Sequence, residues 1–150
     1  MELAAQLAGA IVEQQFDGRA AHRLARLGAI EDDVFQRFAT IDALSNGRAE
    51  VVLGRGSFTE SFPLFGYDLT QYEALFEEKL DLLVKLLDEG EVSWNGTTRA
   101  PLIHQSVYPK TESGRIRTWV GVGGSPESVV RAARHALPLT LAIIGGAPER

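Results

Sequence analysis

Cysteine is absent from this chain of 150 residues, and its absence excludes several kinds of site at once. Without thiols the chain forms no disulfide framework, no thiolate metal site and no cysteine nucleophile. A protein without disulfides suits the cytoplasm, which is therefore the expected location. Long apolar runs are also missing, so no membrane span is expected. The first ten residues contain an acidic residue and no basic lead, so a signal peptide is not expected.

The chain also lacks an excess of basic residues. It has 15 lysines and arginines against 20 aspartates and glutamates, which gives a formal net charge of −5. This balance argues against nucleic acid or an anionic membrane as a partner, while a local basic site for one phosphate stays open. The motifs Gly-x-Ser-x-Gly and Gly-Lys-Ser/Thr do not occur, which argues against a serine hydrolase and a P-loop protein.

Histidine is scarce and scattered. The three histidines are His22, His104 and His135, and no two of them have the spacing of metal ligands. No metal site is therefore expected. His135 falls on an expected helix and is predicted to lie at its surface.

Helix and strand patterns alternate along the chain. Helices are expected at 1–15, 33–44, 69–89 and 125–136, and strands at 23–30, 48–54, 118–122 and 139–144. A short hairpin around 92–96 is expected in an otherwise irregular stretch between 91 and 109. Because helices and strands alternate, the predicted fold is α/β with a parallel sheet, in a single domain over residues 1–150.

Polar residues and glycines mark the expected helix ends. Asp68, with Gln71 three residues later, fits a capping box at the start of the Leu-rich helix. Gly90 is expected to end that helix. Ser125 followed by Pro126 predicts the N-cap and the first helical residue of the next helix.

The segment from Gly54 to Asp68 carries the most chemical information. It begins Gly-Arg-Gly, follows an apolar strand and precedes a long amphipathic helix. Arg55 therefore stands at the carboxyl end of a strand, where α/β proteins bind their ligands. The glycines on either side of Arg55 let backbone come close to a ligand. The polar and aromatic residues that follow are too many for a simple connection and indicate a binding loop.

A second group of candidate binding residues follows the strand at 118–122. Gly124, Ser125 and Ser128 offer backbone N–H groups, two hydroxyls and the positive end of a helix dipole. Holding a phosphate dianion takes fixed positive charge and several convergent donors. Together with Arg55 and Gly56, these residues have that chemistry, and they form the candidate cofactor-binding site.

Two structural roles explain some of the same residues without a ligand. Ser125 would be only the N-cap of its helix, and Arg55 would only pair with a carboxylate such as that of Glu60. Glu60 would orient Arg55, act on protons, or lie solvated in its loop. These alternatives stay open from the sequence.

Four stretches of the chain carry a family resemblance. They are Phe-Ala-Thr-Ile-Asp-Ala-Leu-Ser-Asn-Gly-Arg at 38–48, Gly-Arg-Gly at 54–56 with Phe-Gly-Tyr-Asp at 65–68, Trp-Val-Gly-Val-Gly-Gly-Ser-Pro-Glu-Ser at 119–128, and Leu-Pro-Leu at 137–139. In combination they resemble the bacterial luciferase-like monooxygenase family, whose members are flavin-dependent (β/α)8 barrels. The resemblance covers roughly residues 33–146.

The resemblance implies a partial TIM barrel of roughly the third to the sixth βα units. It implies a flavin-dependent monooxygenase that uses reduced flavin, FMN or a deazaflavin, and acts on paired donors with incorporation of molecular oxygen. The implied substrate is a small organic molecule. In the family, the positions of Arg55, Gly56, Gly124, Ser125 and Ser128 lie near the cofactor phosphate. The family's catalytic histidine has no counterpart here, so no catalytic residue is assigned.

The alternative function is a non-catalytic flavin-binding or degenerate fragment that needs a partner chain. Four parallel strands leave two open sheet edges, and the last strand is strongly apolar. Such edges are expected to be covered by a homo-oligomer or by another chain that completes the barrel.

Overall fold

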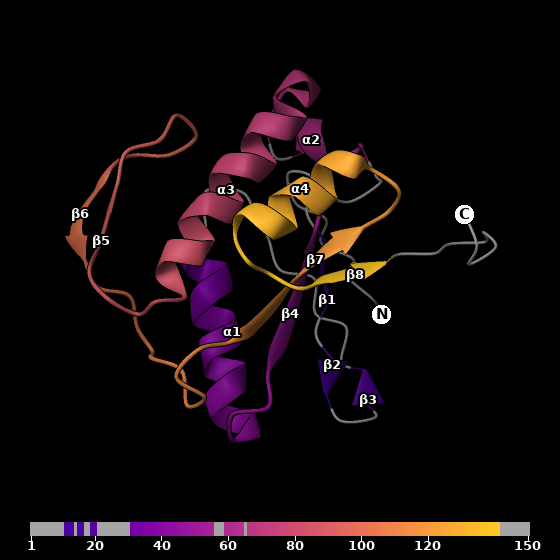
Figure 1. Ribbon diagram of the computed structural model, residues 1–150. Coiled ribbons are helices and arrows are strands. Elements are labelled where there is room, and N and C mark those ends of the chain that lie inside the picture. The colour runs from indigo at the N-terminus through magenta and orange to yellow at the C-terminus, as the bar shows by residue number, and fades with distance from the viewer. Residues whose placement is uncertain are drawn as a thin grey trace.

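The computed structural model describes residues 11–13, 15–16, 19–20, 31–55, 59–64 and 66–141. Its main sheet has four strands in the order β1-β4-β7-β8 (Figure 1). These strands are β1 (Ile11–Glu13), β4 (Glu50–Gly54), β7 (Arg117–Val122) and β8 (Leu139–Leu141). Two smaller ribbons pair β2 (Gln15–Phe16) with β3 (Arg19–Ala20) and β5 (Val92–Trp94) with β6 (Leu102–Gln105). The helices are α1 (Glu31–Ser45), α2 (Ser61–Leu64), the 3-10 turn η1 (Leu69–Gln71), α3 (Tyr72–Leu86) and α4 (Pro126–Arg134).

Three strands of the main sheet are parallel, as the alternation of helices and strands predicts. Leu53 of β4 is the partner of Val120 in β7, and Val122 of β7 is the partner of Leu141 in β8. The carboxyl ends of β4 and β7 therefore lie at the same edge of the sheet. The predicted last strand is confirmed over Leu139–Leu141, and the rest of it lies outside the described residues.

The fourth strand, β1, corrects the predicted sheet and the predicted first helix. Val12 is the partner of Leu53 in an antiparallel ladder, so the sheet is not entirely parallel. The helix predicted over 1–15 is wrong at Ile11–Glu13 and at Gln15, which belong to β1 and β2. The adjacent β-branched residues Ile11 and Val12 favour extended backbone, and pairing with β4 decides the conformation. The other residues of that predicted helix, and the strand predicted at 23–30, lie outside the described part.

The main core lies between α1, α3 and the sheet. In Figure 1, α1 and α3 lie against each other, and α4 lies beside β7. Fully burying a large apolar side chain contributes about 1.5–3 kcal/mol, so this core is the main source of stability. Its members include Phe35 and Phe38 of α1, Leu53 of β4, and Phe76, Leu80, Leu82, Leu83 and Leu86 of α3. The buried positions on α3 confirm the amphipathic helix that its leucine spacing predicts.

A buried carboxylate joins the end of α1 to the segment before β7. Asp42 is fully buried, and its two oxygens accept hydrogen bonds from the backbone N–H groups of Ala49, at 3.2 Å, and Ser113, at 2.8 Å. A buried carboxylate is tolerated when it is hydrogen-bonded in this way. Asp42 therefore ties together two segments that enter β4 and β7.

The start of α3 follows the predicted cap, with a change in detail. The carboxylate of Asp68 accepts a hydrogen bond from the backbone N–H of Thr70 at 2.8 Å. The first turn is the 3-10 turn η1, which includes Gln71. Gln71 is the N-cap residue of α3, but its side chain makes no capping hydrogen bond to that helix. The cap at Asp68 is thus confirmed.

The end of α3 differs from its prediction. The helix ends at Leu86, and the left-handed residue that follows is Glu89, with φ of 56°, instead of Gly90. The carbonyl of Glu89 accepts a hydrogen bond from Lys110 at 2.5 Å, and its carboxylate accepts one from the backbone of Thr111 at 2.9 Å. These contacts from a distant segment hold a backbone conformation that glycine would adopt more readily.

The hairpin predicted around 92–96 is present, with a longer loop than expected. Val92–Trp94 is its first strand and pairs antiparallel with β6 beyond the loop. The carboxylate of Glu78, on α3, accepts hydrogen bonds from the backbone and hydroxyl groups of Thr97 and Thr98 in this loop, at 2.7–2.8 Å. Burial alone would raise the pKa of Glu78, but these hydrogen bonds lower it from 4.5 to about 2. The loop is therefore anchored to α3 through one carboxylate.

No helix in the described residues is long and apolar enough to cross a membrane.

α4 begins with Ser125 at the N-cap position and Pro126 at the first helical position, as predicted. It ends at Arg134, and Ala136, with φ of 52°, follows in the left-handed region.

Candidate functional site

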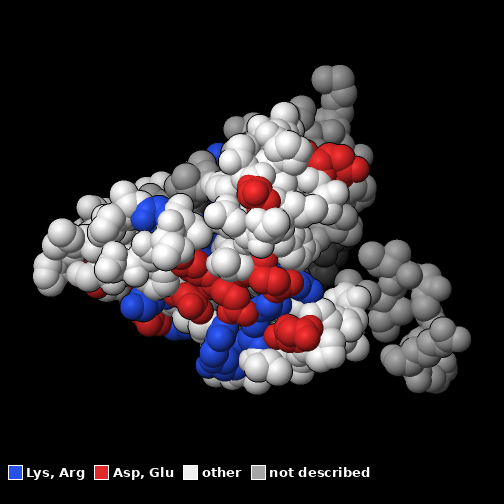
Figure 2. Space-filling model, turned by 90° about the horizontal axis from the view of Figure 1, so that it is seen from above, with Lys and Arg blue, Asp and Glu red and all other residues white. Residues whose placement is uncertain are grey.

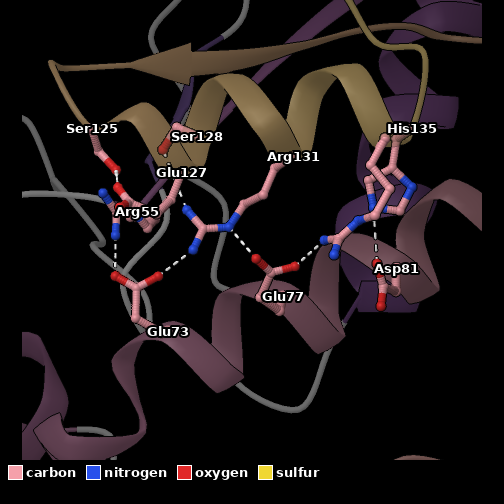
Figure 3. Close-up of polar contacts among 10 residues, drawn as sticks. Arg55, Glu73, Glu77, Asp81, Ser125, Glu127, Ser128, Arg131 and His135 are labelled. Atoms are coloured by element: carbon pink, nitrogen blue, oxygen red, sulfur yellow. Dashed lines mark hydrogen bonds and ion pairs between the residues drawn. The ribbon is translucent and has the colours of Figure 1, made fainter.

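The fold brings two of the predicted binding segments to one edge of the sheet. Arg55 directly follows β4, and Ser125 follows β7 after two glycines. Because β4 and β7 are parallel neighbours, both segments leave the sheet on the same side. Figure 3 shows Arg55 close to Ser125 and Glu127 at the start of α4. Gly56, also predicted to bind the cofactor, lies outside the described residues.

Arg55 has a carboxylate partner, but it is not Glu60. The guanidinium pairs with Glu73 on the first turns of α3 and lies 5.4 Å from the ring centre of Tyr72. Glu60 is exposed. The Arg55 side chain is 20 % exposed, so it is held in place and still reaches the surface. Burial raises the pKa of the Tyr72 phenol, and the charge of Arg55 opposes this shift.

The N-terminus of α4 has the backbone of a capped helix without the usual side-chain cap. Ser125 has φ of −87° and ψ of 118°, but its hydroxyl makes no bond to the helix backbone. The hydroxyl donates instead to a carboxylate oxygen of Glu127, 2.6 Å away. Gly124 has φ of 106°, and apart from its chain neighbours no heavy atom of the described residues lies within 4 Å of where a Cβ would stand. This turn therefore has open space beside groups that suit an anion.

Ser128 lies deeper in the same helix. It is only 2 % exposed, and its hydroxyl accepts a hydrogen bond of 3.4 Å from Arg131. Its backbone N–H bonds to the carbonyl of Ser125 at 3.1 Å. The structure thus places Ser128 under the first turn of α4, next to the buried Arg131, which is not among the residues predicted to bind the cofactor.

Arg131 is the centre of an ion-pair network between α4 and α3 (Figure 3). Its side chain is 5 % exposed and pairs with Glu73 and Glu77, while Arg134 also pairs with Glu77. Burial would lower the pKa of Arg131, but the two carboxylates outweigh it and the pKa is raised. Burial would likewise raise the pKa of Glu77, and the two arginines bring it below its usual value. Figure 2 shows acidic and basic side chains interleaved in a band on the face seen from above.

This network could have been found from helical spacing. Glu73, Glu77 and Asp81 recur every four residues on α3, and Arg131 and His135 have the same spacing on α4. Residues four apart lie on one side of a helix, so an acidic stripe and a basic stripe are both encoded. Which helices meet depends on long-range packing, which neither stripe reveals by itself.

The histidines do not form a metal site in the described residues. Nε2 of His135 lies 2.9 Å from a carboxylate oxygen of Asp81, and the His135 side chain is 14 % exposed. The prediction that His135 lies at the surface is therefore wrong, because α3 covers this side of α4. His104 is exposed in β6, and His22 lies outside the described part. No group of three or more histidine, aspartate or glutamate side chains able to hold a metal ion occurs among the described residues.

Comparisons with known proteins agree with the fold. The family model of the luciferase-like monooxygenases matches residues 33–150. An uncharacterized protein of Sinorhizobium fredii, y4wF, is 31 % identical over 122 residues, which cover 68 % of this chain and 35 % of that protein. The crystal structure of the monooxygenase RslO1 from Streptomyces bottropensis superposes with a TM-score of 0.65 at 24 % identity, over 78 % of this chain and 38 % of that one. The chain thus spans little more than a third of the length of either relative.

Proposed function

Because the chain belongs to the luciferase-like monooxygenase family, we propose that it is the phosphate-binding part of a flavin-dependent monooxygenase. The fold of this family is the (β/α)8 barrel, and β4 with α3 and β7 with α4 are βα units of the kind that build it, while β8 adds the next parallel strand. We assign them to roughly units four to six, and the strand predicted for unit three, at 23–30, lies outside the described residues. The reaction would use reduced flavin, either FMN or a deazaflavin, and dioxygen to oxidise a small organic substrate.

The observation that carries this proposal is the position of Arg55 beside the N-terminus of α4. A phosphate dianion needs fixed positive charge and several converging donors. Arg55 supplies a guanidinium, while Gly124 and Ser125 supply backbone N–H groups, a hydroxyl and open space at a helix N-terminus. The donor set therefore fits the phosphate of a flavin nucleotide. Gly56 and Ser128 complete the proposed site.

The protein's part in the reaction is to bind and orient the cofactor. Reduced flavin, when bound, supplies the electrons that activate dioxygen for transfer of one oxygen atom to the substrate. Arg55 and the first turn of α4 would fix the phosphate end, and Glu73 with Tyr72 would hold the Arg55 guanidinium in position. No residue is assigned to the chemical step.

A titration of the purified chain with FMN, followed by quenching of flavin fluorescence, tests the proposal. We expect saturable binding in the micromolar range, and a loss of at least about tenfold in affinity in Arg55→Ala, as removal of one charged anchor implies. Arg117→Ala is the matched control, because Arg117 is an exposed arginine at the opposite end of β7. An unchanged affinity in Arg55→Ala would contradict the phosphate assignment.

A second function, a flavin-binding chain that is inactive until a homo-oligomer or another chain completes it, rests on two observations. The chain covers only 38 % of the monooxygenase structure that it resembles. Leu139 and Leu141 of β8 are 38 % and 61 % exposed. Binding of FMN without any oxygen-dependent product from added reduced FMN and aldehyde substrates would favour this function. A stable complex with a chain that supplies further strands would support it directly.

A further inference from the structure

The carboxylate of Glu127 already occupies the anion-attracting end of α4. One of its oxygens accepts the hydrogen bond from the Ser125 hydroxyl at 2.6 Å. The hydrogen bond from Ser125, its own backbone N–H and the positive charges of Arg55 and Arg131, in that order, lower the pKa of Glu127. The side chain therefore takes up donors and positive charge that a bound phosphate would also use. Figure 3 shows it between Ser125 and Arg55.

Glu127 differs in its contacts from the acidic residues nearby. Glu73 and Glu77 are tied to the guanidinium of Arg131, which is 5 % exposed. Glu127 is exposed, and within the described residues it is hydrogen-bonded to the Ser125 hydroxyl and to its own backbone N–H. An exposed side chain with such contacts changes rotamer at little cost. The Glu127 carboxylate thus lies where an incoming anion must displace it, and its side chain can rotate away from the helix N-terminus.

We propose that Glu127 is a built-in competitor for the phosphate of the ligand, and so a residue that determines which anions bind. The inference rests on the proposed function of Arg55 and α4 as a phosphate site. When the ligand binds, its phosphate takes the Ser125 hydroxyl and the helix N-terminus, and the Glu127 side chain turns into solvent. The competition selects by charge: a phosphomonoester dianion outcompetes one carboxylate more readily than a singly charged group does.

Gln is the informative replacement at this position. Glu127→Gln keeps an oxygen that accepts from Ser125 and removes the negative charge that opposes an incoming phosphate. A like charge at contact distance weakens anion binding severalfold even in water, so the variant is expected to bind FMN about threefold to tenfold more tightly. Loss of an acidic residue from a first helical turn slightly destabilises the helix, so tighter binding would not come from a more stable fold.

The experiment titrates wild type, Glu127→Gln and Glu112→Gln with FMN and with riboflavin, which has the same ring system and no phosphate. Glu112→Gln makes the same change in net charge at an exposed residue before β7, at the other end of the strand. We expect tighter FMN binding in Glu127→Gln alone, with unchanged riboflavin affinity. In the same assay, inorganic phosphate should displace FMN from Glu127→Gln at a lower concentration than from wild type, because no carboxylate competes with phosphate in the variant.

The outcomes separate this inference from the function on which it rests. If wild type binds FMN and Arg55→Ala weakens that binding, but Glu127→Gln leaves it unchanged or weaker, the competition is refuted and the phosphate site stands. If FMN and riboflavin bind equally to wild type and Arg55→Ala has no effect, the phosphate site itself is wrong. Equal tightening of FMN and riboflavin by Glu127→Gln would also overturn the inference, since riboflavin has no phosphate to compete.

Discussion

Glu73 of α3 accepts a hydrogen bond from the guanidinium of Arg131, which follows it by 58 residues in the chain. The same carboxylate pairs with Arg55, so one residue connects the end of β4 to the middle of α4. Charged pairs at the surface contribute little to stability, whereas a buried charge that loses its partners is costly. Arg131 and Arg134 of α4 both pair with Glu77 of α3, but only Arg131 is buried. Replacing each in turn therefore compares a buried ion pair with an exposed one.

Arg131→Gln is expected to lower the free energy of unfolding by about 2 kcal/mol. The usual cost of breaking a buried pair is about 3–5 kcal/mol, and partial exposure of Glu73 and Glu77 reduces it here. Arg134→Gln is the control, because Arg134 pairs with the same Glu77 but is 51 % exposed, and its loss should cost less than about 1 kcal/mol. Urea denaturation of the two variants measures both values. Equal losses would show that burial of Arg131 has no energetic consequence.

The stability contributed by Glu78 is expected to depend on pH. Its folded pKa, about 2, lies below the ordinary value of 4.5, so the stabilisation is fully present above pH 4.5 and is lost as the pH falls toward 2. Glu78→Gln should lower the free energy of unfolding by about 1 kcal/mol at pH 7, since partial exposure weakens its charged hydrogen bonds. Urea denaturation at pH 7 and pH 2.5 should give a large and a small difference from wild type, respectively. A difference that does not shrink in acid would contradict the role given to the carboxylate.

The two glycines after β7 are expected to respond differently to alanine. Gly124 has φ of 106°, which L-residues rarely adopt, so Gly124→Ala should lower the free energy of unfolding by about 1–3 kcal/mol. Gly123 has no positive φ, and a Cβ there meets open space, so Gly123→Ala should be neutral or slightly stabilising. Thermal unfolding of both variants provides the measurement. Similar melting temperatures for the pair would mean that the turn relaxes without cost.

The elements that could be predicted from sequence are those with strong local patterns. The apolar runs of β4 and β7, the leucine spacing of α3 and the Ser-Pro start of α4 all correspond to observed elements. Their alternation also predicted the parallel pairing, which in the structure brings Arg55 and Ser125 to one sheet edge. Each of these conclusions needs only local periodicity and the rule that parallel strands end on the same side.

The remaining features depend on partners far away in the chain. β1 is extended because it pairs with β4, about forty residues further on, and β5 pairs with β6 across a loop that Glu78 anchors. Glu89 takes a left-handed conformation beside Lys110 and Thr111. The partner of Arg55 is Glu73, whereas the sequence left open a pairing with the nearer Glu60. In each case a tertiary contact overrides the local preference, which periodicity alone does not reveal.

Strand β4 has a hydrogen-bonded neighbour on each side, β1 and β7. In a closed parallel barrel both neighbours run in the same direction as the strand between them, but β1 runs antiparallel to β4. A parallel strand from another chain therefore reaches this side of β4 only by strand exchange, in which Ile11–Glu13 first gives up its ladder. The rate of assembly on this side of β4 would therefore depend on how fast β1 detaches from it.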